Sequence, residues 1–309
     1  MLVTSKSIVC PSVSVAIATY NGARYIKEQL DSILTQTHSV DEIIIVDDCS
    51  SDETWDILTQ HATNNSKIKI FRNETNLGGT KSFEKAICAC HGDYIALADQ
   101  DDYWLPEKLI SAANKLDQQS KNKPLLYCSA LEFVDKDLVH LGMSNLNFKP
   151  SFGNALVENI VTGCTAVFNN SLKKLAKNYK PQQAVMHDWW LYLLATAFGR
   201  VIYDPISYIK YRQHGANVIG ATPSFMYLWR RRLTILWQAK PIVSTLQAAE
   251  FYQYYHQHLS TKNLELAKKF VERRSNSNAR WFIVYSALIY KQNSLDTIAM
   301  KLLIALGWY

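Results

Sequence analysis

The sequence predicts an α/β protein with a doubly wound, mostly parallel sheet and a helical C-terminal extension. Two observations predict this fold. Four short apolar runs, rich in β-branched residues, alternate with segments of helical periodicity through residues 11–105. In addition, 48% of the 309 side chains are apolar and 19% are charged, which allows a large core and excludes collagen-like, low-complexity and disordered chains.

The alternation begins with a strand at residues 12–18, a β-branched run that ends at the turn sequence Thr19-Tyr20-Asn21-Gly22. Residues 24–35 follow as a helix, because apolar side chains recur there at helical spacing. Residues 42–46 form a continuous apolar run, which is typical of a buried parallel strand. The same reasoning predicts a helix at 53–62, a strand at 68–72, a helix at 82–90 and a strand at 94–98.

Three polar clusters directly follow three of these strands. They are Thr19 to Asn21, Asp47 with Asp48, and Asp99 to Asp102. Ligands of a doubly wound sheet bind beyond the carboxyl ends of its parallel strands. We therefore expect the three clusters to converge on one rim of the sheet.

The last cluster, Asp99-Gln100-Asp101-Asp102, places three carboxylates within four residues. Like charges this close repel one another unless protons or a cation compensate. Oxygen ligands with open positions favour Mg²⁺ or Mn²⁺, and a diphosphate would supply further oxygens. The alternative is an acidic turn that caps a helix beginning near Pro106.

Six motifs stand in order along residues 11–220: Thr19-Tyr20-Asn21-Gly22, Val46-Asp47-Asp48-Cys49-Ser50-Ser51-Asp52, Gly92-Asp93-Tyr94-Ile95, Asp99-Gln100-Asp101-Asp102, His187-Asp188 and Gln213-His214-Gly215. Together they resemble glycosyltransferase family 2, which has the GT-A fold. The resemblance implies a nucleotide-diphosphate sugar donor, a divalent metal and an inverting single displacement. It also implies a catalytic domain at 1–220, in which 1–105 binds the nucleotide sugar and 106–220 binds the acceptor.

Carried over position by position, the resemblance also implies residue roles. Asp47 or Asp48 would accept a hydrogen bond from the imide N–H of uracil or thymine, so the donor would be a pyrimidine nucleotide. Asp101 would bind the metal, and the match allows the roles of 99, 101 and 102 to shift by one place. The implied donor-binding residues are Thr19, Tyr20, Asn21, Asp47, Asp48, Asp99, Gln100, Asp102 and Arg212.

The displacement needs a base on the face opposite the diphosphate, and Asp188 resembles the family's residue for that role. The family often has Glu before this Asp, whereas this chain has His187. The alternative is that Asp188 only caps a helix at 189–197. Trp189 and Trp190 would either stack on an acceptor sugar or belong to the core.

The final motif, Tyr211 to Asn217, follows a strand expected at 201–209. The resemblance implies that His214 binds the metal or donates to the leaving phosphate, and that Arg212 offsets the developing charge.

With Asp99 to Asp102, this motif resembles bacterial rhamnosyltransferases that build O-antigen or capsule chains from dTDP-rhamnose. The Gln-x-x-Arg-Trp motif of processive synthases is missing, because Ser277 stands where Gln would precede Arg280-Trp281. One sugar per encounter is therefore expected.

Two rival functions remain open: a transferase for UDP-galactose or UDP-glucose, and a nucleotide-sugar binding protein without turnover. A dehydrogenase is disfavoured, because no Gly-x-Gly-x-x-Gly follows the first strand. The net charge of +6 gives no reason to expect nucleic acid.

Residues 221–309 carry 12 basic and 4 acidic side chains and 15 of the 36 aromatic residues. Residues 225–237 read as a helix with an apolar side beside Arg230 to Arg232. This helix would lie on a membrane that holds a lipid-linked saccharide acceptor, or it would pack on the catalytic domain or a homodimer partner. Because no segment resembles a signal peptide or spans a bilayer, we expect a cytoplasmic protein that is either soluble or peripheral to the membrane.

Overall fold

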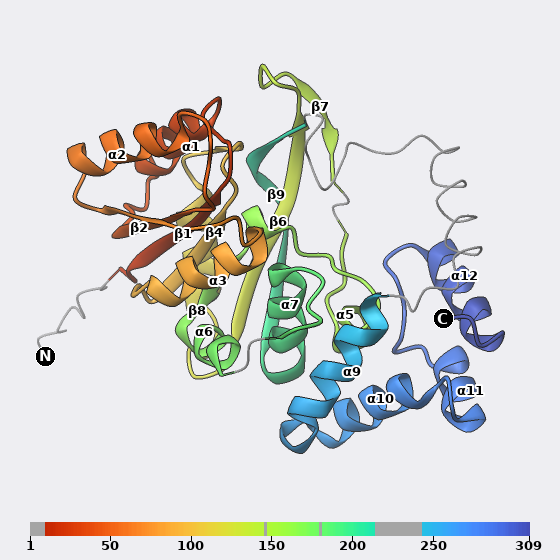
Figure 1. The fold of residues 1–309 in the computed structure, drawn as a ribbon. Coiled ribbons are helices and arrows are strands. Elements are labelled where there is room, and N and C mark those ends of the chain that lie inside the picture. The colour runs from red at the N-terminus through yellow and green to blue at the C-terminus, as the bar shows by residue number, and fades with distance from the viewer. Residues whose placement is uncertain (1–9, 145–146, 179–180, 214–242) are drawn as a thin grey trace, which may run out of the picture.

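The computed structural model describes residues 10–144, 147–178, 181–213 and 243–309, and in these ranges a nine-stranded sheet carries helices on both faces (Figure 1). The strands are β1 (Val13–Thr19), β2 (Glu42–Asp47), β3 (Ile68–Arg72), β4 (Tyr94–Ala98), β5 (Tyr103–Trp104), β6 (Leu125–Val134), β7 (His140–Met143), β8 (Val167–Asn169) and β9 (Arg200–Arg212). The sheet order is β3-β2-β1-β4-β8-β6-β9-β5, and β7 pairs with β6.

The helices up to residue 213 are α1 (Ile26–Leu34), α2 (Thr54–Asn64), α3 (Gly79–Ala89), α4 (Lys108–Asp117), α5 (Phe152–Ala155), α6 (Asn170–Lys177) and α7 (His187–Phe198), with a 3₁₀ turn, η1, at Gly163–Thr165. The seven elements predicted between residues 12 and 98 are confirmed in type and order. Some ends shift by a few residues, since α3 begins at Gly79 rather than at 82. Further along the chain, the strand expected at 201–209 is β9, which extends to Arg212.

The first four strands are parallel to one another, and their carboxyl ends meet at one rim. Thr19 of β1 pairs with Asp47 of β2, and Ile17 pairs with Ala98 of β4. Beyond β4 the sheet is mixed, because β8 is antiparallel to both β4 and β6, while β9 is parallel to β6. The prediction of a mostly parallel sheet therefore describes the first half, and antiparallel neighbours, which need no crossover helix, complete the second.

Two apolar cores lie on opposite faces of the sheet, which is the doubly wound arrangement that the sequence predicts. One core joins α1, α2 and α4 to β1 side chains such as Val15 and Ile17. The other joins α3, α6 and α7 to Ala16 and to Ile44 and Val46 of β2. Successive side chains of a strand point to opposite faces, so a continuous apolar run fills both cores.

The C-terminal extension consists of α9 (Val243–Tyr255), the 3₁₀ turn η2 (His256–His258), α10 (Thr261–Glu272), α11 (Ser277–Tyr285) and α12 (Ser294–Ala305). It joins the second core through α9, where Phe251 lies 5.8 Å from the Trp190 ring and 5.7 Å from the Phe152 ring. The helix expected at 225–237 lies outside the described residues. Within the described ranges, no helix has the length and apolarity needed to cross a bilayer.

Candidate active site

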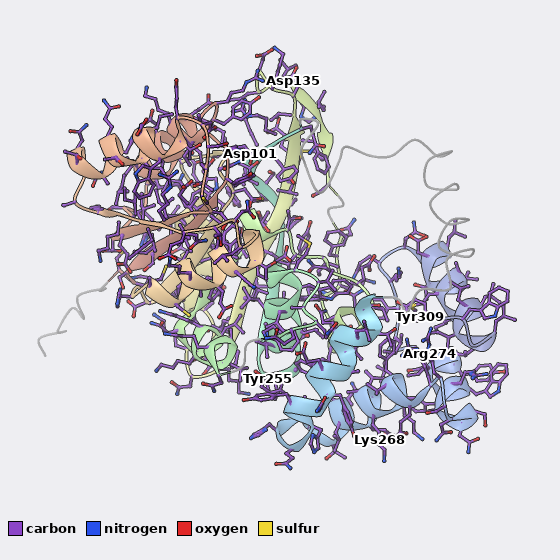
Figure 2. All side chains as sticks on the ribbon, in the orientation of Figure 1. Asp101, Asp135, Tyr255, Lys268, Arg274 and Tyr309 are labelled. Carbon is purple, nitrogen blue, oxygen red and sulfur yellow. The ribbon has the colours of Figure 1, made fainter. Side chains whose placement is uncertain are left out.

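A cavity of about 470 Å³ opens at the carboxyl ends of β1, β2 and β4. Its wall comes from segments far apart in the sequence: Ala18, Thr19, Tyr20, Asp48, Gly79, Thr80, Phe83, Asp99, Gln100, Asp101, Thr162, Gly163, Val185, Met186, His187, Asp188 and Tyr211. Figure 2 labels Asp101 at this rim, close to the strand ends. The predicted convergence of the three loops on one rim is confirmed.

Hydrogen bonds join the loop after β1 to the loop after β4. The Tyr20 backbone N–H donates to Gln100 Oε1 at 2.8 Å, and Gln100 Nε2 donates back to the Tyr20 carbonyl at 3.1 Å. A Cβ atom at Gly22 would lie 2.3 Å from Gln100 Oε1, so a side chain there would displace the glutamine from this position. One glutamine thus sets the spacing of two loops on the cavity wall.

The two adjacent aspartates at the end of β2 have different surroundings. Asp47 is fully buried and does not line the cavity, because its carboxylate accepts a hydrogen bond from Thr19 Oγ1 at 3.2 Å and pairs with Arg72 Nε at 3.2 Å. Asp48 does line the cavity. Of the two candidates for the base-binding role, only Asp48 lines the cavity.

Asp48 also fixes the start of α3. Its carboxylate accepts hydrogen bonds from the backbone N–H groups of Leu77 and Gly78, both at 2.8 Å, and from Asn73 Nδ2 at 2.7 Å. Burial acts to raise the pKa of Asp48, but these hydrogen bonds outweigh it and hold the pKa below its ordinary value. Asp48 is therefore ionised at neutral pH and anchors the helix that supplies Gly79 and Thr80 to the wall.

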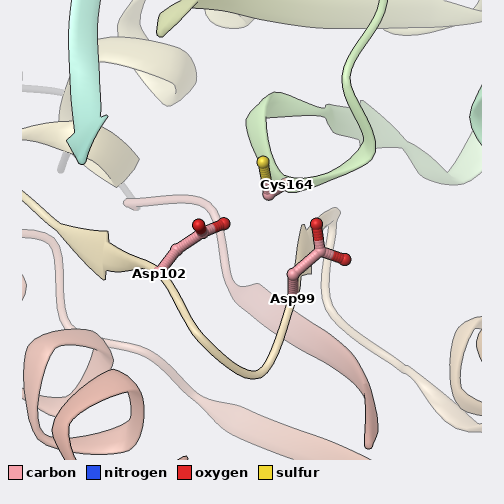
Figure 3. A group of neighbouring side chains, drawn as sticks. All are labelled: Asp99, Asp102 and Cys164. Atoms are coloured by element: carbon pink, nitrogen blue, oxygen red, sulfur yellow. The ribbon is translucent and has the colours of Figure 1, made fainter. Parts of the chain in front are cut away.

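The acidic loop after β4 forms a dense cluster of ligand atoms with one cysteine. Single ligand atoms of Asp99, Asp102 and Cys164 lie within 4.8 Å of one another (Figure 3). Burial raises the pKa of Asp99 to about 7, and the negative charges of Asp101 and Asp188 add to the effect. Burial and the negative charges of Asp99 and Asp101 raise the pKa of Asp102 well above its ordinary range.

The carboxylates of the acidic loop fit a divalent metal. Asp99 and Asp101 both line the cavity, and a cation beside them would relieve the repulsion and the cost of burial that raise the pKa of Asp99. Hard carboxylate oxygens suit Mg²⁺ or Mn²⁺, whereas the thiol of Cys164 does not. The residues present are thus suited to the predicted metal, with Asp99 and Asp101 as the candidate ligands.

Asp188 lies on the cavity wall in the first turn of α7. It is the second residue of the helix, whose N-cap is Met186, and its Oδ1 accepts the Trp189 backbone N–H at 2.7 Å. Burial raises the pKa of Asp188 to about 6, despite hydrogen bonds that oppose the shift. A carboxylate with a pKa close to neutrality is suited to take a proton during a reaction near pH 7.

His187 stands beside Asp188 on the wall, and its ring stacks on Phe83 at a centroid distance of 4.2 Å. Burial lowers the pKa of His187 to about 4, so the imidazole is neutral at pH 7. A Cβ atom at Gly163 would lie 3.1 Å from His187 Nε2 and 3.7 Å from Asp188 Oδ2. Glycine at 163 therefore leaves space in front of both side chains.

Residues 14–174 match the family described as Glycosyl transferase family 2. The chain belongs to this family. It is 33% identical to the dTDP-rhamnosyl transferase RfbG of Shigella flexneri over 232 residues, which cover 70% of this chain and 77% of that protein. It is 41% identical, over 99 residues, to the putative teichuronic acid biosynthesis glycosyltransferase TuaG of Bacillus subtilis, covering 32% of this chain and 39% of that protein.

Among solved structures, residues 1–349 of S. aureus TarS in complex with UDP-GlcNAc superpose with a TM-score of 0.54 at 17% identity, covering 96% of this chain and 91% of that one. This similarity supports the GT-A fold. The chain is thus a family 2 glycosyltransferase, and the sequence-based identification is confirmed.

Three of the residues predicted to bind the donor have side chains that do not line the cavity. Asn21 holds two loops together: its backbone N–H donates to Ser50 Oγ at 2.9 Å, and its Oδ1 accepts from the Ser51 N–H at 2.9 Å. Asp102 is buried behind the cavity and accepts the Arg212 backbone N–H at 3.2 Å. Like Asp47, neither side chain lines the cavity.

Arg212 does not line the cavity, because its guanidinium is buried against protein groups. Its Nε donates to the Asp101 carbonyl at 2.9 Å, its Nη2 pairs with Glu28, and the guanidinium lies 4.4 Å from the centre of the Tyr25 ring. Arg212 therefore supports the backbone of the acidic loop. The neighbouring His214 lies outside the described residues.

The two tryptophans after Asp188 face the core and not the cavity. Trp190 is buried and packs against Phe251 and Tyr255. Trp189 donates from its indole Nε1 to the Ala155 carbonyl at 2.7 Å and packs against the same core. Of the alternatives for these residues, the structure supports the core.

Several wall residues were not predicted from the sequence. They are Gly79, Thr80, Phe83, Thr162 and Gly163. The pair Gly78-Gly79 directly before a helix was a usable signal, because a helix N-terminus that backbone can approach closely is suited to anions. Phe83 and Thr162 carry no such signal, since only the folded chain brings them to the rim.

Proposed function

We propose that this glycosyltransferase moves L-rhamnose from dTDP-L-rhamnose to a lipid-linked saccharide in the synthesis of a bacterial surface polysaccharide. The observation that carries the proposal is that Asp188 shares one cavity with Asp99 and Asp101. A proton acceptor and a set of acidic groups suited to a metal-bound diphosphate then lie around the same space. The choice of rhamnose is supported by the 33% identity to the RfbG transferase.

The reaction is proposed as a single displacement. Asp188 takes the proton from an acceptor hydroxyl, whose oxygen forms a bond to the anomeric carbon of the sugar. The bond from that carbon to the diphosphate oxygen breaks, and its electron pair leaves with the nucleotide. Because attack and departure occur on opposite faces, a β-linked donor yields an α-linked rhamnose.

The remaining wall residues take supporting roles in this proposal. Asp48, Thr19 and Tyr20 would surround the pyrimidine base, and Gln100 would keep the first and third loops at the distance that the nucleotide needs. Mg²⁺ or Mn²⁺, held by Asp99 and Asp101, would supply positive charge to the diphosphate. His214 would be a further ligand.

The two halves of the catalytic domain are assigned different substrates. We assign donor binding to the half at 1–105, which supplies the first three loops, and acceptor binding to 106–220, which supplies Gly163, His187 and Asp188. One sugar would be added per encounter, since the Gln-x-x-Arg-Trp motif is missing.

A donor panel tests the proposal. Purified protein is incubated with dTDP-rhamnose, UDP-galactose, UDP-glucose and UDP-GlcNAc, together with a lipid-linked saccharide acceptor, and nucleotide release is measured with and without a chelator. We expect turnover of dTDP-rhamnose that the chelator removes and that added Mg²⁺ or Mn²⁺ restores. Turnover of a UDP-hexose but not of dTDP-rhamnose would overturn the choice of donor. Full activity in the presence of the chelator would overturn the proposed dependence on a divalent metal.

A further inference from the structure

The helices α11 and α12 lie at the end of the molecule away from α1 and α2 (Figure 1), and many of their apolar side chains are exposed. We call this surface the α11–α12 face. It consists of exposed side chains from two helices that pack on each other and from the segments that follow each of them: Trp281, Phe282, Tyr285, Leu288, Leu295, Ile298, Leu302, Leu306 and Trp308. Exposed apolar groups of this number on one face mark an interaction surface.

The helix α12 is apolar on two sides. Met300 and Ile304 point inward and are buried, while Leu295, Ile298 and Leu302 point outward and are 66%, 56% and 60% exposed. The outward residues follow one another at spacings of three and four, so they form one stripe along the helix. The helix is well capped, because the Asn293 side chain accepts the N–H groups of its first turn. Fraying at its start therefore does not explain the exposure.

Cations lie within and beside this face. Lys269 Nζ is 5.9 Å from the centre of the Phe282 ring, and Lys301 Nζ donates to the Ser286 carbonyl at 2.8 Å, next to Tyr285. The Arg280 guanidinium lies within 3.5 Å of the position that a Cβ at Gly307 would take, beside Trp308. Across residues 243–309 as a whole, 8 basic side chains outnumber 4 acidic ones. Figure 2 labels two further basic residues of this region, Lys268 and Arg274.

We propose that the α11–α12 face docks on a membrane surface with anionic headgroups, and that Leu295, Ile298 and Leu302 insert below those headgroups. Aliphatic side chains bind the acyl boundary, Trp and Tyr are favoured at the headgroup level, and Lys and Arg attract anionic lipid. The face offers all three in one place. A second copy is the poorer occupant, because a two-fold contact would bring the Lys269, Arg280 and Lys301 charges of both copies together.

This inference rests on the surface itself and not on the identity of the transferred sugar. It gives the proposed lipid-linked acceptor a physical route to the enzyme, since docking would hold the chain at the bilayer that carries this acceptor. Vesicle binding and sugar transfer are measured separately, so the failure of one proposal is distinguishable from the failure of the other.

Sedimentation of the full chain with lipid vesicles tests the docking. One set of vesicles contains phosphatidylglycerol and a second contains phosphatidylcholine alone. We expect binding to the anionic set that high salt weakens, and clearly weaker binding to the neutral set. The double variant Ile298→Ser with Leu302→Ser should lower the affinity for anionic vesicles by about tenfold or more.

The chain offers a matched control. Ile206 and Leu141 are 55% and 54% exposed, close to Ile298 and Leu302, but lie on β9 and β7. Ile206→Ser with Leu141→Ser should bind vesicles as the unmodified chain does, and both double variants should retain donor binding as a check of folding. Equal vesicle binding by the two double variants would overturn the proposal. So would a dimer in sedimentation equilibrium that only the Ile298 and Leu302 variant converts to a monomer, since the occupant would then be a second copy.

Discussion

Both ends of the parallel strands carry buried carboxylates, and Glu42 at the amino end differs from Asp99 and Asp188 at the cavity beyond the carboxyl end. At the amino end, Glu42 of β2 accepts hydrogen bonds from Ser14 Oγ at 2.7 Å, from Lys69 Nζ at 3.0 Å and from the His91 backbone N–H. Burial acts to raise the pKa of Glu42, but these donors outweigh it and lower the pKa to about 2. At the carboxyl end, burial instead raises the pKa of Asp99 to about 7 and that of Asp188 to about 6.

The difference shows what each end does. Glu42 lines a cavity of about 360 Å³, yet its charge is already matched by protein donors, so it ties β1, β2 and β3 together. Burial outweighs the hydrogen bonds that Asp99 and Asp188 accept, so the pKa of each is raised toward neutrality. A buried carboxylate whose negative charge is not fully stabilised by protein donors is available to bind a metal, a substrate or a proton.

The largest expected effect comes from removing the base. Asp188→Asn keeps the size of the side chain and its contact with the Trp189 N–H, but it cannot take a proton. We expect kcat for sugar transfer to fall by about 10²- to 10⁴-fold, with the affinity for the donor nucleotide nearly unchanged. Titration calorimetry and a transfer assay measure the two quantities.

The control for this variant is Asp137→Asn, which changes an exposed carboxylate in the turn between β6 and β7. It should transfer sugar at the rate of the unmodified enzyme. Normal transfer by Asp188→Asn would remove Asp188 from the mechanism.

The pH profile gives the next largest effect. The base must be ionised to act, and the pKa of Asp188 is raised to about 6, so activity should be complete above pH 7 and decline as the pH falls through 6. At pH 5 we expect kcat to be about tenfold below its plateau, because each pH unit below the pKa lowers the ionised fraction about tenfold. A profile that is flat from pH 8 to pH 5 would contradict this role.

Much of the carboxyl rim could be predicted from the sequence, because it is built from local patterns. A βαβ alternation sets the direction of each strand, so acids that directly follow strands must share a rim. Asp48, Asp99 and Asp101 reach the cavity wall for this reason, whereas Asp188 reaches it from the first turn of α7. The same patterns located neither Phe83 nor Thr162, whose neighbours in the chain resemble ordinary helix and loop.

The roles of individual side chains at the rim could not be predicted, because they depend on contacts with residues that are distant in the sequence. Arg212 is held by Glu28, which lies 184 positions away, and this ion pair turns a candidate phosphate ligand into a support for the acidic loop. Trp190 became core because α9 supplies Phe251 and Tyr255 to cover it. Cys164 lies beside Asp99 and Asp102, but no sequence motif around this single cysteine predicted that position.

A moderate effect on donor binding is expected when the loop after β1 is no longer joined to the loop after β4. Gln100→Ala removes both hydrogen bonds to the Tyr20 backbone, each worth about 1 kcal/mol, and frees the loop that lines the base side of the cavity. We expect the donor KM to rise about tenfold, with a smaller change in kcat. Gln118→Ala, an exposed position at the end of α4, is the control and should leave KM unchanged. A donor KM that stays constant in Gln100→Ala would show that the loops hold their spacing without this contact.

The smallest effect on catalysis should come from the amino end, where the comparison predicts a change in stability alone. Glu42→Gln removes the charge that Ser14, Lys69 and His91 compensate, so we expect a loss of about 2 kcal/mol in the free energy of unfolding at pH 7 and a kcat within about twofold of the original.

The sign of the pH dependence follows from the lowered pKa. Glu42 has a folded-state pKa of about 2 against an ordinary 4.5, so its contribution is complete above pH 4.5 and is lost as the pH falls toward 2. Urea unfolding at pH 7 and at pH 3.5 should therefore show the gap between Glu42→Gln and the unmodified chain narrowing by about 1 kcal/mol. The exposed Glu107→Gln should show no gap at either pH. If Glu42→Gln instead lowered kcat as Asp188→Asn does, Glu42 would contribute to catalysis and not to stability alone.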